Sequence, residues 1–295
     1  MLGLTGDARY ADMMERALYN NVLAGVSLDT THWFYVNPLA CFREHQRQPW
    51  FGCTCCPTNM VRTLAAVPGY IYGRSKEGIW VHLYDASRLN WRLAEGTRVV
   101  LRQQTRYPWD GRVNLTVEPA EAATFSLFLR VPGWCQTYSA WVNGQSFEGK
   151  GRGGYLEIRR RWQPGDRVAL EMRMPVQLME SDPRVRCNLG SVAVQRGPLV
   201  FCAESVDNPA VNLRDLELKG RPAIKAEFRG DLLEGVVTLR AKGRDVSPDA
   251  PRGPLYRPLK SFESQWRDVD VTLIPYYGWA NRGVSHMVVW MPYAR

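Results

Sequence analysis

The chain has 295 residues, with 38 lysines and arginines against 29 aspartates and glutamates, a net charge of +9, and 45% hydrophobic residues. This is an ordinary globular composition, long enough for two or three domains. The basic residues are spread along the chain without the runs or motifs of a nucleic-acid binder. There is no apolar run of the roughly 18 residues that a membrane helix needs, and no signal-peptide pattern. We therefore expect no nucleic-acid partner, no membrane contact and, by default, cytoplasmic residence.

The first seventy residues carry helical patterns. Asp7 is a suitable N-cap, since its carboxylate can accept backbone N–H groups of a first turn. Apolar residues then recur at helical spacing and predict a helix over about 8–23. The segment 33–36 is predicted as a short strand, and a second helix is predicted to begin at Pro57, a favoured first-turn residue. The apolar residues of this second helix are predicted to face the core: Met60, Val61, Leu64 and Val67.

Beyond Tyr70 the hydrophobic pattern changes to a period of two. Many short alternating segments bounded by turns predict an antiparallel β-sandwich. Asn143-Gly144 is the strongest hairpin signal, because both residues tolerate positive φ. A loop rich in proline, glycine and arginine is predicted over 243–258. The predicted strands are 79–84, 99–104, 113–117, 124–131, 139–142, 155–159, 167–172, two within 191–202 around Gly197-Pro198, 269–274 and 287–291.

These elements predict a mainly β fold with an N-terminal α segment. We place the α segment at 1–73, a middle β-sandwich domain at 74–184 and a C-terminal β domain at 185–295. No internal repeat or low-complexity segment interrupts them.

Three of the seven cysteines cluster at Cys53, Cys55 and Cys56, just before the second predicted helix. An odd number of unevenly spaced cysteines fits reduced thiols better than a disulfide framework. The positive end of a helix macrodipole favours thiolate over thiol, so Cys55 or Cys56 should have a lowered pKa and raised nucleophilicity. The spacing is too tight for the usual zinc knuckle, and no second pair follows. By spacing alone, three interpretations stay open: a fortuitous cluster, part of a metal site, and a catalytic nucleophile.

The other reactive side chains are given structural interpretations. Glu44 and His45 lie in a polar loop that we interpret as solvated, with a metal contact as the alternative, and His82 and His286 lie in strand patterns and are interpreted as core or surface histidines. Buried thiols in strand-like contexts are predicted at Cys135, Cys187 and Cys202.

Several long motifs resemble one known family. Three of them resemble the C-terminal part of the catalytic domain of glycoside hydrolase family 127, the retaining β-L-arabinofuranosidases and their relatives: Tyr10–Asn21 (YADMMERALYNN), Phe34–Leu39 (FYVNPL) and Trp50–Asn59 (WFGCTCCPTN). Two resemble its middle β-sandwich, Tyr107–Gly111 (YPWDG) and Val131–Trp134 (VPGW). Two more resemble its C-terminal β domain, Gln195–Val200 (QRGPLV) and Pro275–Gly283 (PYYGWANRG).

The resemblance implies a glycosidase whose nucleophile is a zinc-bound cysteine thiolate, with a glutamate as acid/base and with zinc held by three cysteines and a glutamate. The nucleophile maps onto Cys55, which also binds zinc, and the second zinc ligand of the adjacent pair maps onto Cys56. Tyr35 is implied as a sugar contact, with packing beneath the site as the alternative, and Cys53 is left a structural role. The segment 1–73 would be the C-terminal remnant of an (α/α)6 barrel of the six-hairpin type, followed by the two β domains.

One departure from the family pattern affects the expected activity. The remaining zinc ligands, in a Glu-x-Cys motif, and the acid/base glutamate belong upstream of this sequence. We therefore expect a C-terminal fragment with weak or no activity alone, which needs an N-terminal half from a longer product or another chain and tends to self-associate, for instance as a homodimer. The expected substrate is an L-arabinofuranoside or a related plant-derived glycan. The alternative is a noncatalytic carbohydrate-binding or assembly β-sandwich module.

Overall fold

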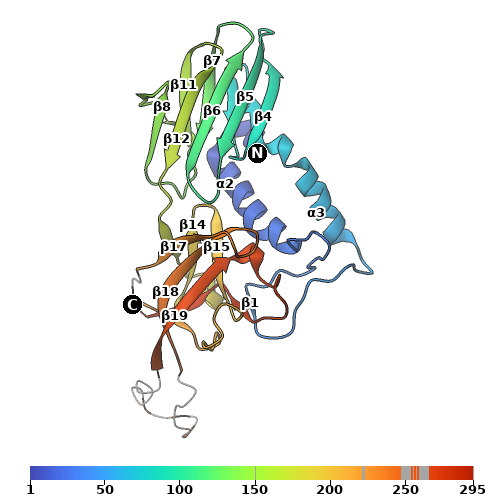
Figure 1. Ribbon diagram of the computed structural model, residues 1–295, viewed down its shortest axis with the longest axis vertical. Helices are drawn as coiled ribbons and strands as arrows, with labels where there is room; N and C mark the ends of the chain where they lie inside the picture. The colour runs from blue at the N-terminus through green and yellow to red at the C-terminus, as the bar shows by residue number, and fades with distance from the viewer. Residues whose placement is uncertain are drawn as a thin grey trace. The chain divides into compact units, whose positions relative to one another are not determined.

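The computed structural model describes residues 1–149, 151–220, 223–246, 254, 256, 258 and 266–294. These residues form a mainly β protein with short helices near the N-terminus (Figure 1), as predicted. The chain divides into two compact units, one formed by Met1–Tyr19 and Thr58–Pro175 and the other by Asn20–Pro57 and Val176–Arg295. These units do not test the boundaries predicted after residues 73 and 184, which stay predictions, as does the barrel origin of 1–73.

The N-terminal helical path follows the prediction closely. A short helix α1 (Leu2–Thr5) precedes α2 (Ala8–Ala17). The Asp7 carboxylate accepts the Arg9 backbone N–H at 3.0 Å and so caps α2. The path continues through a π turn at Leu18–Val22 and a 3-10 turn at Leu23–Gly25. Only the geometry of the last turns departs from the predicted α-helix.

The second helix corrects two predictions. Helix α3 (Cys55–Ala66) begins two residues before Pro57, and a short α4 (Pro68–Ile71) follows it. Pro57 is the one described residue of α3 that is buried, and Val61 is 52% exposed, so the apolar side chains predicted to face a core do not do so. Helical spacing shows which face is apolar but not whether a partner covers it. The segment 33–36 is not a strand, since only isolated bridges involve Trp33.

Among the described residues, the first unit holds a five-stranded sheet in the order β10-β11-β7-β3-β2 and a six-stranded sheet in the order β4-β5-β6-β12-β8-β9. All pairs are antiparallel except β3–β7, which is parallel. The strands are β2 (Tyr72–Arg74), β3 (Gly78–Val81), β4 (Ser87–Arg92), β5 (Arg98–Thr105), β6 (Arg112–Pro119), β7 (Ala123–Arg130), β8 (Tyr138–Val142), β9 (Gln145–Ser146), β10 (Gly151–Arg152), β11 (Tyr155–Trp162) and β12 (Asp166–Met172).

The period-two pattern explains how these sheets form their core. Along β6, Val113, Leu115 and Val117 are buried and alternate with more exposed neighbours, as a strand with one solvated face requires. The predicted hairpin turn is confirmed, because Asn143 and Gly144 join β8 to β9 with φ of 52° and 81°.

The second unit holds a ten-stranded sheet whose pairings close on themselves. Among the described residues the ring runs β15-β19-β18-β16-β21-β14 and returns to β15, with β1, β20, β13 and β17 attached. The predicted strand pair around Gly197-Pro198 is confirmed as β14 and β15. The strands are β1 (Ala40–Cys41), β13 (Val176–Met179), β14 (Ser191–Arg196), β15 (Leu199–Glu204), β16 (Glu217–Lys219), β17 (Lys225–Arg229), β18 (Val236–Val246), β19 (Trp266–Pro275), β20 (Met287–Val288) and β21 (Met291–Ala294).

Several smaller predictions have mixed outcomes. The predicted loop over 243–258 is wrong at its start, because 243–246 continue β18, and 247–253, 255 and 257 lie outside the described residues. Cys135 and Cys202 are buried as predicted, whereas Cys187 is exposed because it lies in a 3-10 turn (Arg186–Asn188) and not in a strand. Among the described residues, no helix is long and apolar enough to span a bilayer.

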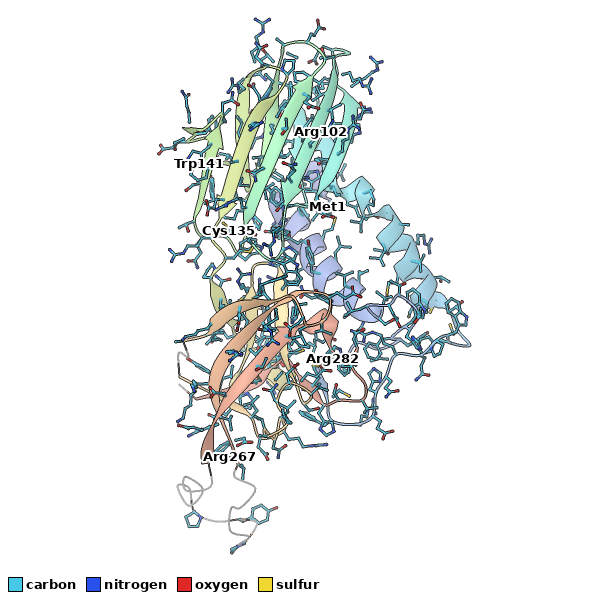
Figure 2. The ribbon with its side chains drawn as sticks, viewed as in Figure 1. Met1, Arg102, Cys135, Trp141, Arg267 and Arg282 are labelled. Atoms are coloured by element: carbon cyan, nitrogen blue, oxygen red, sulfur yellow. The ribbon has the colours of Figure 1, made fainter. Side chains whose placement is uncertain are left out.

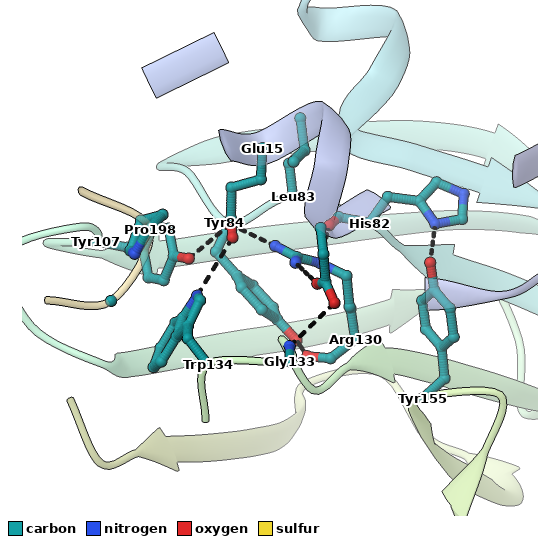
Figure 3. Close-up of polar contacts among 12 residues, drawn as sticks. Glu15, His82, Leu83, Tyr84, Tyr107, Arg130, Gly133, Trp134, Tyr155 and Pro198 are labelled. Atoms are coloured by element: carbon teal, nitrogen blue, oxygen red, sulfur yellow. Dashed lines mark hydrogen bonds and ion pairs between the residues drawn. The ribbon is translucent and has the colours of Figure 1, made fainter. Parts of the chain in front are cut away.

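A buried ion cluster attaches α2 to the sheets of the first unit (Figure 3). Arg130, on β7, is fully buried and pairs with Asp12 at 2.6 Å and with Glu15, both on α2. Glu15 also accepts the Tyr107 hydroxyl at 2.5 Å and the Trp134 indole N–H at 3.4 Å. Buried charges are tolerated only when they are paired and hydrogen-bonded. Each charge of this cluster meets both conditions.

Candidate active site

The structure brings the three clustered thiols together at the start of α3. The Cys55 Sγ lies 3.7 Å from that of Cys53 and 3.8 Å from that of Cys56. Cys53 and Cys55 are exposed, Cys56 is partly buried, and all three are free of disulfides. The two cysteines singled out for chemistry are therefore neighbours in space as well as in sequence. Cys53, for which we predicted a structural role, lies with them.

Tyr35 lies against the same thiols. Its hydroxyl is 3.3 Å from the Cys55 Sγ and 3.8 Å from the Cys53 Sγ. Its ring meets Phe51 edge-on at 5.4 Å between centroids. The side chain is 44% exposed, so Tyr35 presents its hydroxyl to the thiols from a position open to solvent.

The hydrogen bonds of this cluster favour ionisation of one thiol over the others. The Tyr35 hydroxyl, followed by the Cys53 and Cys56 thiols, lowers the pKa of Cys55. The same contact with Cys55 raises the pKa of Tyr35, as expected for a donor to a thiolate. Burial is the main cause that raises the pKa of Cys56. Cys55 is thus the thiol that these local contacts favour as the nucleophilic thiolate.

Aromatic packing holds the residues on either side of Tyr35. Phe34 is buried and stacks on Trp279 at 5.1 Å and on His45 at 4.6 Å between ring centroids. The His45 Nε2 lies 3.0 Å from the Val36 carbonyl oxygen. Since Phe34 and Val36 are both held, the backbone of Tyr35 is fixed from both sides.

A buried arginine completes this support. Arg47 lies over the Phe34 ring at 4.3 Å and donates to the carbonyls of Trp279 and Ala24, each at 2.8 Å, and of Tyr277 at 3.3 Å. Burial lowers its pKa to about 10, which still leaves it charged at neutral pH. Sequence reasoning missed Phe34, His45, Arg47 and Trp279 as a supporting group. The resembling motifs contained two of them, but nothing local indicated that they meet.

The thiols suit part of a zinc site. Thiolates on a tetrahedral zinc, with Zn–S bonds near 2.3 Å, lie about 3.8 Å apart, which matches the two Sγ–Sγ distances from Cys55. Within the residues that the structure describes, no group of three or more histidine, cysteine or acidic side chains is arranged to hold a metal by itself. The cluster therefore fits a partial donor set. His45 does not join it, because its Nε2 contacts a carbonyl.

Comparison with protein families matches almost the whole chain to glycoside hydrolases. Residues 1–69 match the catalytic domain of the β-L-arabinofuranosidases of family GH127, residues 78–174 match the GH127 middle domain, and residues 176–292 match the GH127 C-terminal domain. The chain belongs to glycoside hydrolase family 127.

Individual relatives agree with this assignment. A non-reducing end β-L-arabinofuranosidase of Bifidobacterium longum subsp. longum is 37% identical over 308 residues, which cover 98% of this chain and 46% of that protein. The crystal structure of a GH127 β-L-arabinofuranosidase from Geobacillus stearothermophilus T6 superposes with a TM-score of 0.94 at 42% identity, covering 100% of this chain and 48% of that one. A GH127 β-arabinofuranosidase structure gives 0.88 at 35% identity, with coverages of 98% and 46%. The chain thus spans about half the length of the relatives it matches.

Proposed function

We propose that this chain supplies the thiol part of a retaining β-L-arabinofuranosidase active site, with Cys55 as the nucleophile. The observation that carries the proposal is the set of three hydrogen-bonding neighbours around the Cys55 Sγ: the Tyr35 hydroxyl and the thiols of Cys53 and Cys56. Family membership supports the reaction class. The proposed substrate is an L-arabinofuranoside of a plant-derived glycan, named after the activity of the relatives.

The proposed reaction has two steps. The Cys55 thiolate attacks the anomeric carbon, so that an S–C bond forms as the bond to the leaving oxygen breaks, and that oxygen takes a proton from a general acid. Water, deprotonated by the same group, then displaces the sulfur, and two inversions give net retention. Tyr35 would donate to the thiolate before attack and would lie beside the incoming sugar.

Zinc is the proposed cofactor, with Cys55 and Cys56 as ligands and Cys53 beside them. When bound, zinc would keep a coordinated thiol deprotonated and fix its position. We further propose that the remaining ligands and the acid/base carboxylate come from residues outside this sequence. The isolated chain would then show little or no hydrolase activity, because general acid–base help is worth about 10²–10⁴-fold in rate.

Thiol labelling tests the assignment of Cys55 without requiring turnover. The metal-free chain is treated with limiting iodoacetamide and the modified peptides are quantified by mass spectrometry, with and without arabinose. Cys55 should label fastest, and arabinose should slow its labelling alone. Cys187, an exposed thiol in a turn, is the matched reference. Equal rates at Cys55 and Cys187, or no protection by arabinose, would contradict the proposal.

Zinc binding and hydrolysis test the rest. Zinc affinity is measured by titration for the chain, Cys55→Ala, Cys56→Ala and Cys187→Ala, and each is assayed on a chromogenic arabinofuranoside. The first two variants should bind zinc more weakly than the unaltered chain, and Cys187→Ala should bind it equally. Rapid turnover by the chain alone would overturn the proposal that the acid/base carboxylate lies elsewhere.

A further inference from the structure

A hollow of about 580 Å³ lies on the outer face of the six-stranded sheet in the first unit. Burial alternates along the strands beneath it: Leu115 and Val168 point into the core, while their neighbours point outward. The outward side chains that line the hollow come from four adjacent strands: Gln104 of β5, Asn114 and Thr116 of β6, Arg167 and Ala169 of β12, and Trp141 of β8. Figure 2 labels Trp141 on this sheet.

The strand register explains why the sheet is hollow here. Trp141 pairs with Ala169, Ala169 with Asn114, and Asn114 with Gln104, so the four residues form one row across the sheet. Neighbouring strands lie about 4.8 Å apart, which puts Trp141 and Asn114 about 10 Å apart. Only the methyl group of Ala169 lies between them. An indole and an amide therefore form the two walls, and a small side chain forms the floor.

The polar groups that line this hollow have no partners among the described residues. Within the described parts of the chain, no side-chain hydrogen bond or ion pair is made by Gln104, Asn114, Thr116, Trp141 or Arg167. Two amides, a hydroxyl, an indole N–H and a guanidinium are thus all available to a ligand, and they offer both donors and acceptors.

On the surrounding face of the same sheet, by contrast, charged side chains form ion pairs. Arg102 pairs with Glu118 at 3.3 Å, and Arg112 pairs with Glu171 at 3.6 Å. The charged side chains that border the hollow are therefore compensated by neighbours. Among the described residues that line the hollow there is no carboxylate, and Arg167 is the one cation.

We propose that this hollow is a binding subsite for a neutral oligosaccharide, separate from the thiol cluster of the second unit. A sugar ring presents an apolar C–H face that packs on an indole, and it carries hydroxyls that both donate and accept hydrogen bonds, as amide side chains do. Such sites combine an aromatic surface with a few placed polar groups. Four of the five polar side chains in the lining are uncharged and suit hydroxyls, and the polygalacturonate gel in the test below checks whether the Arg167 guanidinium draws carboxylates instead. The choice of arabinan as the first ligand rests on the proposed function.

Affinity electrophoresis tests this subsite. The chain is run in native gels containing soluble arabinan, soluble xylan or polygalacturonate, beside a non-binding marker protein. One of the neutral polysaccharides should retard it. Trp141→Ala should weaken that binding by about tenfold or more, which corresponds to about 1.4 kcal/mol, and Asn114→Ala should weaken it less. Tyr138→Ala is the matched control, because it removes a ring that is 38% exposed on the same strand but outside the hollow.

Two further variants separate this proposal from the proposed function. Trp141→Phe keeps a ring and should retain most of the binding. Cys55→Ala should leave the binding unchanged even if it abolishes all thiol chemistry. The proposal is overturned if neither neutral polysaccharide retards the chain, if only polygalacturonate does, if Trp141→Ala and Tyr138→Ala bind equally, or if Cys55→Ala removes the binding. Equal thermal unfolding of the variants excludes misfolding as the cause of a loss.

Discussion

The Arg130 cluster of the first unit and the Cys55 cluster of the second use polar groups in opposite ways. Arg130 is fully buried, and each charge around it has a partner. The thiols of Cys53 and Cys55 are open to solvent, and the hydrogen bonds of the cluster favour ionisation of the Cys55 sulfur. A buried cluster whose polar groups are all paired fixes the local geometry. An exposed cluster whose hydrogen bonds stabilise one thiolate provides a reactive group.

Replacing Arg130 should cause the largest loss of stability. Arg130→Met leaves Glu15 buried without its cation, and breaking one side of a buried pair costs about 3–5 kcal/mol. Urea unfolding measures the change. Arg112→Met is the matched control, because its partner Glu171 and Arg112 itself are mostly exposed and such pairs contribute under about 1 kcal/mol. Similar losses in the two variants would contradict the contrast between buried and exposed ion pairs.

His82 should make the first unit sensitive to acid. Burial, followed by the charge of Arg130, lowers its pKa to about 4, and its Nδ1 lies 2.7 Å from the Tyr155 hydroxyl. Between its ordinary pKa of about 6.5 and 4 the unfolded chain binds a proton that the folded chain does not, so stability falls as the pH falls. The loss should reach at most about 3 kcal/mol at pH 4.

Comparing the wild-type chain with His82→Asn checks that sign. The free energy of unfolding is measured from pH 7 to pH 4 for both proteins, and the variant should lack the part of the slope that lies below about pH 6.5. An unchanged slope would assign the acid sensitivity to other groups.

Removing the Tyr35 hydroxyl should change reactivity and leave stability nearly constant. Tyr35→Phe removes the main cause that lowers the pKa of Cys55, so the pH of half-maximal alkylation of Cys55 should rise in chelator-treated protein. His45→Ala, which frees Val36 and one face of Phe34, should shift it in the same direction by less. A lower midpoint in Tyr35→Phe would contradict the donor role.

The exposed side of α3 should affect association more than folding. Val61→Glu changes an exposed apolar residue, and such surface substitutions alter stability by about 0.5 kcal/mol or less. Sedimentation at several concentrations should show less self-association than in the wild-type chain. A monomeric wild-type chain would remove the reason for this prediction.

The parts of the fold that were predictable depend on local sequence. Alternation and turn chemistry located most strands and the Asn143-Gly144 hairpin, because both act over a few residues. The contacts of Arg130 with Asp12 and Glu15 join residues more than 100 positions apart, and no local pattern encodes them. Likewise, the spacing of α3 identified an apolar face but did not show that, among the described residues, Pro57 is the one α3 residue that is buried.

The candidate site was predictable in part for a different reason. Spacing alone left the cysteine cluster open, and resemblance to a family singled out Cys55, Cys56 and Tyr35. Neither showed that the Cys53 Sγ lies 3.7 Å from the Cys55 Sγ, nor that the rings of Phe34, His45 and Trp279 pack against one another. These depend on a tertiary arrangement that brings residues 34–47 to residues 277–279.

The strand β1 limits how this protein can be shortened. Ala40 and Cys41, from the segment that matches a catalytic domain, pair with Val288 and Met287 of β20. A truncation that removes residues up to the family-domain boundary near residue 70 would remove β1. It would leave the backbone N–H and C=O groups along that edge of β20 without partners. Such an uncovered edge can recruit a strand from another molecule, so the C-terminal domain expressed alone should aggregate unless residues 20–57 accompany it.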